Sequence, residues 1–460
     1  MRRTLAAVLI AALLPVAAAA QDAPATDSGR EALALLRKGI GFRTVAGQGQ
    51  VPAYAAYLKQ QLVAAGFADG DVVFTPVGET GYLTARYGGR DRAAKPTILL
   101  GHMDVVAADP ADWTRDPFTA VVEGGYVFGR GALDNKADVS ILIATLMKLK
   151  RAGWTPKRDM VLLLTGDEET SMATTHAAAD RFASAALVLN ADAGGGTLDD
   201  SGKPTVYGLQ AAEKIYGDFR LTITDPGGHS SRPGPTNAIA SLAAAVGRIA
   251  AYRFPAEQNE ITRAYLSGSA ARNPGPVGDA MRAFAANPRD IAAADLLSAR
   301  PDTVGQVRTT CVPTQFEGGH APNALPQRAT ANINCRIFPG TSRAAVQAQL
   351  VKLIDDPKIT VALIDNGTIE AGASPLDPRV LAAITAALAA RAPGVPVIPA
   401  MEAGATDSMH FRARGIPSFG VGSVFLKPSD EFAHGLNERL PVATIDPGIA
   451  WWESILKALA

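Results

Sequence analysis

Three acidic residues, Asp167, Glu168 and Glu169, are adjacent in the sequence and follow the apolar run 160–165 after a single glycine, Gly166. Adjacent like charges repel, so a fold that gathers them near its core has usually provided a cation. Carboxylate oxygens suit zinc, manganese or magnesium as ligands. One acid can then bind the metal while its neighbour takes a proton from an attacking water. The segment therefore indicates metal-assisted hydrolysis, with a solvated acidic loop as the alternative.

A histidine that could bind the same metal is His102, which follows the apolar run 97–100. A metal-binding imidazole usually needs a carboxylate or carbonyl at its other nitrogen to fix its tautomer, and Asp104 could supply one. An isolated His-x-Asp pair is more typical of a protein surface. His102 and Asp104 therefore indicate a metal site only in combination with the other acidic residues.

Asp134 lies in the glycine-rich segment 129–136, ahead of a predicted helix. A carboxylate presented by a tight turn can bridge two cations, as two-metal hydrolases require. Asp134 could equally cap that helix. Asp192, after the apolar run 185–189, and His434 are weak candidates alone. Both become metal ligands only as members of the whole set.

The elements that must position these residues alternate along the chain, which predicts an α/β layer architecture. The runs 97–100 and 160–165 are expected to be buried strands, and 138–150 has apolar residues at helical spacing. In such βαβ sheets, reactive side chains collect beyond the carboxyl ends of the strands. His102 and the acidic residues after position 165 would lie there.

A second domain is predicted to interrupt the first, because the pattern changes from about Tyr216. Strand-like alternation at 218–224 is followed by helical spacing over 236–252. Two more strands are expected at 309–317 and 328–338. These elements indicate an inserted α+β domain.

The domain boundaries follow from this pattern. Helical spacing at 344–354, 378–390 and 445–459 is consistent with a return to the first domain, whereas 255–302 has no strong period and is expected to form helices and loops. We expect a signal peptide at 1–20, a first part of the catalytic domain at 21–214, an inserted lid or dimerisation domain at 215–338, and a second part of the catalytic domain at 339–460.

Length and composition fit a globular protein of two domains with a small-molecule partner. A chain of 460 residues exceeds one ordinary core. Lys and Arg total 44, as do Asp and Glu, so no basic excess suggests a nucleic acid as partner. Hydrophobic residues make up 47% and charged residues 19%, which argues against disorder.

The N-terminal segment has the pattern of a secretory signal peptide. Arg2 and Arg3 precede the apolar run 5–16, and alanines at 18–20 form a small-residue cleavage site. The apolar run is shorter than the ~20 residues of a membrane-spanning helix, which makes a membrane anchor the weaker alternative. We expect export to the periplasm or the medium, cleavage after Ala20, and no membrane association afterwards.

Cys311 and Cys335 are the only cysteines, and each lies in a predicted strand. An antiparallel register that places Gly318 opposite Arg328 also places Cys311 opposite Cys335, at a separation that a disulfide can bridge. The alternative is a pair of buried free thiols, because a slip of one residue would turn the two side chains to opposite faces.

Taken together, these segments resemble the dizinc aminoacylase, carboxypeptidase G and dipeptidase group of metallopeptidases, peptidase family M20, which includes succinyl-diaminopimelate desuccinylase. The resemblance covers roughly residues 30 to 460. It implies an α/β, dizinc exopeptidase-like catalytic domain, built on a mixed sheet flanked by helices, with an inserted α+β lid. It rests on segments that occur in the family's order: 101–104, 129–136, 166–169, Asp192, 227–230 and His434.

The resemblance implies two zinc ions per chain, with other divalent metals such as Co²⁺ or Mn²⁺ as alternatives. Asp134 would bridge the two metals, Asp104 would orient His102, and Glu168 would be the general base. The ligands would be His102, Asp134 and Asp192 for one zinc and Asp134, Glu169 and His434 for the other.

Four further residues match substrate-binding positions of the family. His229 would stabilise the oxyanion, and in dimeric relatives this histidine comes from the neighbouring subunit, so a homodimer is one expectation. Asn323 and Arg336 would bind substrate, with Arg336 as the partner of a substrate carboxylate. Gly404 matches a glycine-rich substrate loop. Asn334 replaces the aspartate usual before the arginine, which leaves the orientation of Arg336 open.

The resulting hypothesis is a zinc-dependent exopeptidase, either a carboxypeptidase or a dipeptidase, that cleaves a peptide or amide bond next to a carboxylate-bearing residue. An N-acyl amino acid deacylase is the alternative, since both reactions cleave an amide beside a carboxylate. A more distant alternative is a periplasmic binding protein that kept the fold without the activity.

Overall fold

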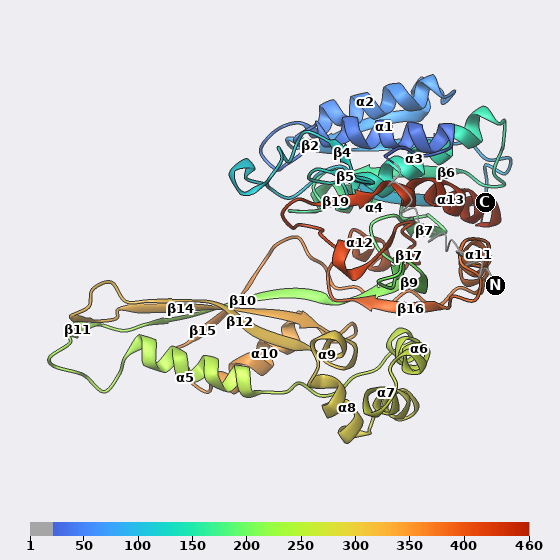
Figure 1. Ribbon diagram of the computed structural model, residues 1–460. Coiled ribbons are helices and arrows are strands. Elements are labelled where there is room, and N and C mark those ends of the chain that lie inside the picture. The colour runs from blue at the N-terminus through green and yellow to red at the C-terminus, as the bar shows by residue number, and fades with distance from the viewer. Residues whose placement is uncertain (1–21, 460) are drawn as a thin grey trace, which may run out of the picture.

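A computed structural model describes residues 22–459, which form a layered body and a long arm (Figure 1). The predicted signal peptide, residues 1–20, lies outside the described residues. Within 22–459, no helix combines the length and the apolar character needed to cross a membrane.

A mixed sheet organises the body. Its central strands β6 (Met160–Thr165), β3 (Thr97–His102) and β7 (Leu187–Asn190) run parallel, and all their residues are buried. The two apolar runs predicted as buried strands therefore form the middle of the sheet. The outer strands are β1 (Val72–Val77), β2 (Thr80–Tyr87), β8 (Gly195–Leu198), β9 (Pro204–Glu213), β16 (Val397–Glu402), β17 (Ser418–Gly420) and β18 (Phe425–Leu426). Their order is β1-β2-β6-β3-β7-β17-β9-β8-β18, with β16 paired to β9.

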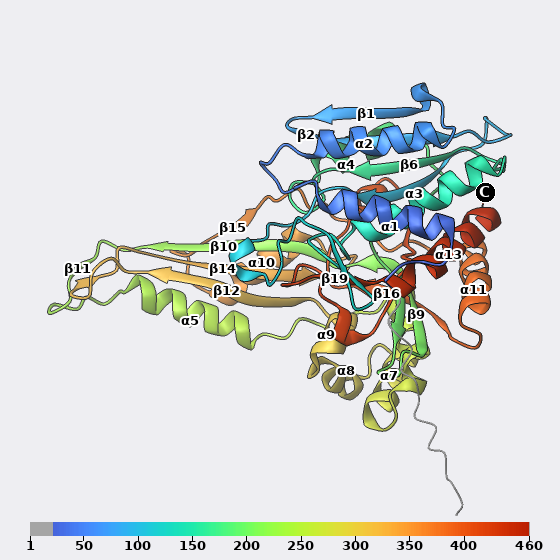
Figure 2. The same cartoon turned by 45° about the horizontal axis from the view of Figure 1, so that its top comes forward.

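Helices cover both faces of this sheet, because its central strands are apolar on both sides. Leu99 and Leu162 belong to one core, and their neighbours Ile98 and Val161 belong to the other. The predicted helix 138–150 is present and starts two residues earlier, at Lys136. The first core contains α1 (Asp27–Ile40), α2 (Val51–Ala64), α3 (Lys136–Arg151), α11 (Pro378–Arg391) and α13 (Ile445–Leu459); the second contains α4 (Ala173–Arg181) and α12 (Ser408–Arg412) (Figure 2).

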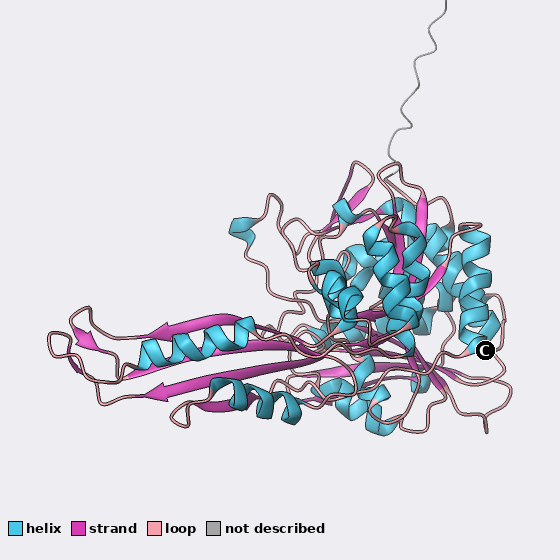
Figure 3. Cartoon of the chain, turned by 90° about the horizontal axis from the view of Figure 1, so that it is seen from below, coloured by secondary structure: helices cyan, strands magenta, loops and turns pink. Residues whose placement is uncertain are grey.

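The arm is built on a second, antiparallel sheet in the order β12-β14-β10-β15. Two helices pack on one face of it, as the view from below shows (Figure 3). Buried residues alternate with more exposed ones along β10 and β14, as is typical of a sheet that is covered on one side. The elements are β10 (Ile215–Thr224), β12 (Thr310–Gly318), β14 (Arg328–Ile337), β15 (Thr360–Ile364), α5 (Ala238–Ala251) and α10 (Arg343–Ile354).

The expected return to the catalytic domain at position 339 is too early. β15 (Thr360–Ile364) pairs with β10, so the chain completes the arm's sheet before it goes back to the body. The intervening helix α10 buries Val346 and Leu350 in the arm's core. The inserted segment therefore extends from Ile215 to Ile364.

A disulfide joins Cys311 to Cys335 across β12 and β14, with a Cα–Cα distance of 4.1 Å. The two cysteines are register partners, as predicted. The other register pair used in that prediction, Gly318 opposite Arg328, is wrong, because Gly318 lies opposite Ala329. A β-bulge between Pro313 and Gln315 shifts the register by one residue, and Pro313 itself has no N–H to donate to the ladder.

The smaller elements lie at the ends of the arm and beside the body. The segment 255–302, expected to form helices and loops, forms most of a helical cluster that continues to Val307, has its own core, and packs its first helix on β16. The cluster comprises α6 (Glu260–Ser269), α7 (Pro276–Ala286), α8 (Ile291–Ser298) and α9 (Pro301–Val307). The short strands are β4 (Val121–Glu123), β5 (Tyr126–Phe128) and β19 (Arg439–Pro441) in one small sheet, and β11 (Gly228–His229) and β13 (Ala324–Leu325) in another.

Candidate metal centre

His102 is the last residue of β3 and is completely surrounded by protein. Its Nδ1 lies 3.0 Å from the carbonyl oxygen of Asp104. With its hydrogen on Nδ1, the ring donates to that carbonyl and presents the lone pair of Nε2 on the other side. The predicted role of Asp104 in orienting His102 therefore fits the geometry, although the backbone oxygen is closer than the carboxylate, which is 3.5 Å away.

Asp134 lies between two histidines that are distant in sequence. Its Oδ1 is 3.0 Å from His102 Nε2, and its Oδ2 is 3.1 Å from His434 Nε2. Asp192 Oδ1 is 3.3 Å from the same nitrogen of His102, and Glu169 Oε1 is 2.9 Å from that of His434. The structure thus brings together all five residues that the sequence predicted as ligands.

This set of donors fits a pair of divalent cations. His102, Asp134 and Glu169 each offer one atom within 4.8 Å of the others, and so do His102, Glu168 and Asp192. The Nε2 lone pair of His102 faces carboxylate oxygens that are also acceptors, an arrangement that a cation or a proton must hold together. Imidazole and carboxylate ligands suit zinc and related metals.

The electrostatics of the cluster favour the same reading. Burial raises the pKa of Asp192 to about 7, and the neighbouring carboxylates add to the shift. Burial and Asp192 also raise the pKa of Glu168 well above its usual range. The pKa of His434 is raised to about 10 by its hydrogen bonds to Asp134 and Glu169. Carboxylates this close and this buried repel one another, and positive charge among them would relieve the repulsion.

The turn that carries Asp134 is fixed by hydrogen bonds from the neighbouring residue Lys136. The N-cap of α3 is Asn135, so the alternative that Asp134 caps this helix does not hold. Lys136 is fully buried and donates through Nζ to the carbonyl oxygens of Gly39 and Phe42, at 3.0 and 2.9 Å. The turn is thereby fastened to the end of α1, and the Asp134 side chain is left to face the histidines.

The three acids after β6 have different roles. Asp167 accepts hydrogen bonds from the backbone N–H groups of Ala173 and Thr174, at 2.8 and 3.0 Å, and so caps α4. The backbone N–H groups of Glu168 and Glu169 donate instead to the Asp104 carboxylate, at 3.1 and 3.0 Å. Only the last two acids of the run therefore belong to the cluster around His102.

Sequence reasoning assigned no role to the buried ion pair between Arg130 Nη1 and Glu438 Oε2, which are 2.7 Å apart. Arg130 lies in the glycine-rich segment that the sequence singled out, and Glu438 is fully buried just before β19. A glutamate ahead of a short strand has no local signature of burial. Nothing in the sequence therefore distinguished Glu438 from a surface acid.

Two lid residues, His229 and Asn323, lie at the far tip of the arm. The backbone N–H of Ser230 donates to the Asn323 carbonyl oxygen at 3.0 Å, which places the two segments side by side. His229 Nδ1 accepts a hydrogen bond from Ser231 N at 3.1 Å. β11, which contains His229, is remote from β6 in two views (Figures 1 and 2). Within one chain, therefore, neither residue reaches the cluster around His102 and Asp134.

Arg336 and Gly404 meet where the arm joins the body. Arg336 Nη1 donates to the carbonyl oxygen of Ala403, next to Gly404, at 3.1 Å, and its guanidinium lies over the Tyr216 ring at 4.6 Å. Asn334 donates through Nδ2 to Asp218 Oδ1 at 2.9 Å. The asparagine that departs from the family pattern therefore bonds a carboxylate on the neighbouring strand, in the polar face that also carries Arg336.

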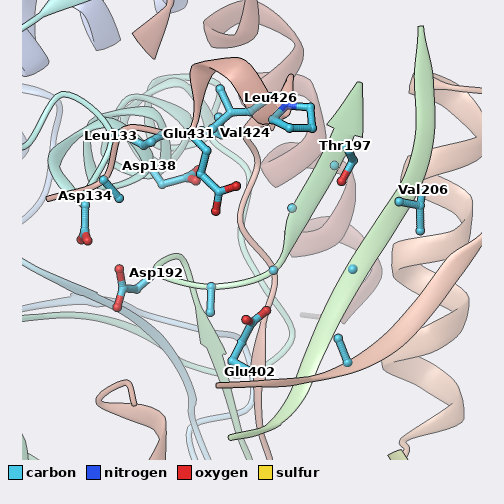
Figure 4. A pocket seen from close by; sticks show the side chains of 18 of the residues that line it. Leu133, Asp134, Asp138, Asp192, Thr197, Val206, Glu402, Val424, Leu426 and Glu431 are labelled. Carbon is cyan, nitrogen blue, oxygen red and sulfur yellow. The ribbon is translucent and has the colours of Figure 1, made fainter. Parts of the chain in front are cut away.

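A cavity of about 570 Å³ opens beside Asp134 and Asp192 of the candidate metal centre. Asp134 and Asp192 lie at one side of it, and the carboxylates of Glu402 and Glu431 point into it (Figure 4). Tyr265 of α6 also contributes to its wall, so the helical cluster of the insertion reaches this cavity. Its apolar lining includes Leu133, Val206, Ile398, Val424 and Leu426.

Comparison with known proteins gives one family. Residues 98–458 match the model of peptidase family M20/M25/M40. The chain is 26% identical over 383 residues to the N-fatty-acyl-amino acid synthase/hydrolase PM20D1.1 of Danio rerio, covering 80% of this chain and 73% of that protein. It is 25% identical over 391 residues to probable carboxypeptidase S-like 2 of Dictyostelium discoideum, covering 82% and 74%.

A solved structure confirms the fold predicted from the resemblance. The M20 family metallo-carboxypeptidase Sso-CP2 from Sulfolobus solfataricus superposes with a TM-score of 0.73, over 93% of this chain and 98% of that one. Sequence identity in this superposition is 21%. The likeness therefore supports the arrangement of the body and the arm.

Proposed function

The chain belongs to peptidase family M20/M25/M40 and is a hydrolase of C–N bonds, and from this premise we propose that it is an exopeptidase acting at a pair of zinc ions. The scissile bond would lie next to a residue with a free carboxylate. The observation that carries the proposal is the position of Asp134, with one carboxylate oxygen on His102 and the other on His434. Such a carboxylate can bridge two metals.

The proposed ligands form two sets that share Asp134. His102 and Asp192 complete the first set, and Glu169 and His434 complete the second. When bound, the cations would polarise the scissile carbonyl and lower the pKa of a water. Co²⁺ or Mn²⁺ could replace zinc in this donor set, since both accept imidazole and carboxylate ligands.

Glu168 is the proposed general base. It is buried, and it clusters with His102 and Asp192. The hydrogen bond from its backbone N–H to Asp104 fixes the position of the Glu168 backbone, from which the side chain extends. Glu168 would take a proton from the attacking water and return it to the leaving nitrogen. That nitrogen then departs as a neutral amine.

Substrate binding is proposed for the lid residues. Arg336 has a planar guanidinium suited to a bidentate contact with a carboxylate. In the structure it donates to the carbonyl oxygen of Ala403, which precedes Gly404. His229 and Asn323 are remote from the centre of their own chain. A homodimer would let the arm of one subunit deliver these two residues to the centre of the other, where His229 would stabilise the oxyanion.

Deacylation of N-acyl amino acids is the second candidate, and one feature favours it. Part of the wall of the cavity beside Asp134 and Asp192 is apolar, formed by Leu133, Val206, Ile398, Val424 and Leu426, and could receive an acyl chain. The relative from Danio rerio is a hydrolase of N-fatty-acyl amino acids by its name. An inert binding protein is disfavoured, because the proposed ligands and the base are all present.

Export is proposed on two grounds. The N-terminal pattern is that of a signal peptide, and a disulfide such as that between Cys311 and Cys335 persists in oxidising compartments. A periplasmic or secreted enzyme would meet small peptides or N-acyl amino acids as substrates. Fractionation of cells that express the full chain, followed by mass measurement of the mature N-terminus, tests the location.

Hydrolysis assays on the zinc-loaded chain test the reaction. Dipeptides, longer peptides and N-acyl amino acids are compared, each with a free and with an amidated carboxyl group. We expect cleavage of substrates with the free carboxylate and a large loss of kcat/KM on amidation, because Arg336 loses its partner. Equal rates on free and amidated substrates would reject carboxylate recognition, and the preferred acyl part decides between peptidase and deacylase.

A further inference from the structure

The buried Glu438 carboxylate accepts four hydrogen bonds, and the proposed reaction does not use it. Its side chain is 0% exposed, and that of its partner Arg130 is 4% exposed. The Trp113 ring covers the guanidinium of Arg130 at 5.1 Å. A charge placed so far from water is costly unless it is paired and hydrogen-bonded.

All the donors to Glu438 come from the turn that ends at Asp134. Oε1 accepts from the backbone N–H groups of Leu133, at 2.7 Å, and Asp134, at 2.9 Å. Oε2 accepts from the backbone N–H of Gly131 at 3.1 Å and from Arg130 Nη1 at 2.7 Å. One carboxylate therefore sets the path of the backbone from which the Asp134 side chain extends.

The same pair also fixes the second histidine. Arg130 Nη2 donates to the carbonyl oxygen of His434 at 3.3 Å. The backbone of Glu438 adds a further link, because its carbonyl oxygen accepts from Gly129 N at 3.0 Å. Asp134 and His434, which lie far apart in sequence, are thereby tied to each other through one ion pair.

We propose that Glu438 is a positioning residue that sets the distance and direction between the Asp134 carboxylate and the His434 imidazole. The inference rests on the proposed metal centre. Ligands of a metal pair must be held to within about 0.5 Å of their productive geometry. Glu438 does this without touching metal or substrate, through the Asp134 backbone on one side and through Arg130 and the His434 backbone on the other.

The variant Glu438→Gln tests this role. The amide oxygen can still accept from two of the four donors, but the amide NH₂ then faces the other two. These are Gly131 N–H and Arg130 in one orientation, and the N–H groups of Leu133 and Asp134 in the other. We expect Zn²⁺ and Co²⁺ to bind about 10- to 100-fold more weakly, as when an outer partner of a metal ligand is lost. The absorption bands of the Co²⁺ form should shift, and kcat should fall more than KM rises.

Two further variants separate positioning from general stability. Asp159→Asn is a matched control, since Asp159 accepts from Arg86 Nε at 2.6 Å and from the backbone N–H of Gly89 at 2.7 Å, at the opposite end of β6. It should lower the melting temperature and leave metal affinity unchanged. Arg130→Lys keeps the positive charge but loses the fork that reaches both Glu438 and His434, so it should weaken metal binding even if Glu438→Gln does not fold.

The readout is titration of the metal-free chain with Zn²⁺ and with Co²⁺ against a competing chelator, so it does not depend on hydrolysis. Weaker binding and a shifted Co²⁺ spectrum in folded Glu438→Gln or Arg130→Lys chains support the inference. Wild-type affinity and spectrum in these variants, with only a lower melting temperature, would overturn it. A wild-type chain that binds two metals but cleaves no substrate would reject the proposed function alone, whereas a wild-type chain that binds no metal would reject both.

Discussion

The Asp104 carboxylate holds the backbone N–H of Glu168 at 3.1 Å, so the residue behind His102 also supports the proposed base. Asp104 thereby connects the ends of β3 and β6. The backbone of Glu168 is therefore held by a residue that is not a proposed metal ligand, and replacing the Glu168 side chain should leave the ligands in place.

Glu168→Ala is expected to lower kcat by about 10²- to 10⁴-fold, the usual contribution of a positioned base. Metal content should remain at two ions per chain by elemental analysis, because every proposed ligand is still present. Near-normal turnover of this variant would rule out Glu168 as the base.

Glu169→Ala should behave in the opposite way. Glu169 Oε1 faces His434 Nε2 at 2.9 Å, so its loss removes a ligand from one side of the pair. We expect reduced metal stoichiometry, together with lower activity that excess metal partly restores. Unchanged stoichiometry would mean that the roles of the two adjacent glutamates are reversed.

His229→Ala is expected to reduce turnover strongly and metal content very little, because β11, which contains His229, lies at the tip of the arm. His320→Ala is the control, since His320 is another exposed histidine of the arm. If two subunits share their sites, mixing His229→Ala with Glu168→Ala chains should restore part of the activity. A monomer by light scattering that is nevertheless inactivated by His229→Ala would contradict shared sites.

Thiol titration of the unfolded, unreduced protein is expected to find no free cysteine, because Cys311 and Cys335 are bonded. The bond spans a sequence separation of 24 residues, for which the chain-entropy model gives about 3 kcal/mol. A chain with both cysteines replaced by serine should lose about that free energy of unfolding. Two titrating thiols per chain would show that the bond does not form.

Lys214 gives a pH dependence that can be tested by denaturation. Burial lowers its pKa from the usual 10.5 to about 7, and Glu257 opposes this shift. Between these two values the unfolded chain binds more protons than the folded one, so the free energy of unfolding should rise with pH from about 7 toward 10.5. Below pH 7 this group adds no slope.

The variant Lys214→Met should remove this rise, and Lys352→Met, at an exposed position on α10, should keep it. Urea denaturation of the metal-free chain at several pH values measures the slope without a contribution from metal release. A Lys214→Met chain with the wild-type slope would show that Lys214 keeps its ordinary pKa in the folded state.

The central strands, and the gathering of polar side chains at their ends, could be predicted from the sequence, because β3 and β6 are short apolar runs that end at polar residues. Parallel strands bring such residues to one edge, which accounts for His102, Glu168 and Glu169. His434 could be placed only through the resemblance, since its own neighbours have no pattern of a metal motif.

Other features depend on long-range packing that a local pattern does not carry. Asp167 resembles its two neighbours in sequence, and only the position of α4 makes it a cap. β15 was missed because its partner β10 lies far earlier in the chain. The bulge beside Pro313 changed the register of β12, and the buried state of Glu438 depends on donors near Asp134.

The wide separation of Asp134 and His434 along the chain has a consequence for biosynthesis. At a synthesis rate of roughly 5–20 residues per second, His434 follows Asp134 by about 15 to 60 s. For most of that interval, while the arm between 215 and 364 is being made, the nascent polypeptide lacks only His434 of the five proposed ligands. If His434 is a ligand as proposed, the metal centre can be completed, and hydrolysis can begin, only after nearly the whole protein has been translated.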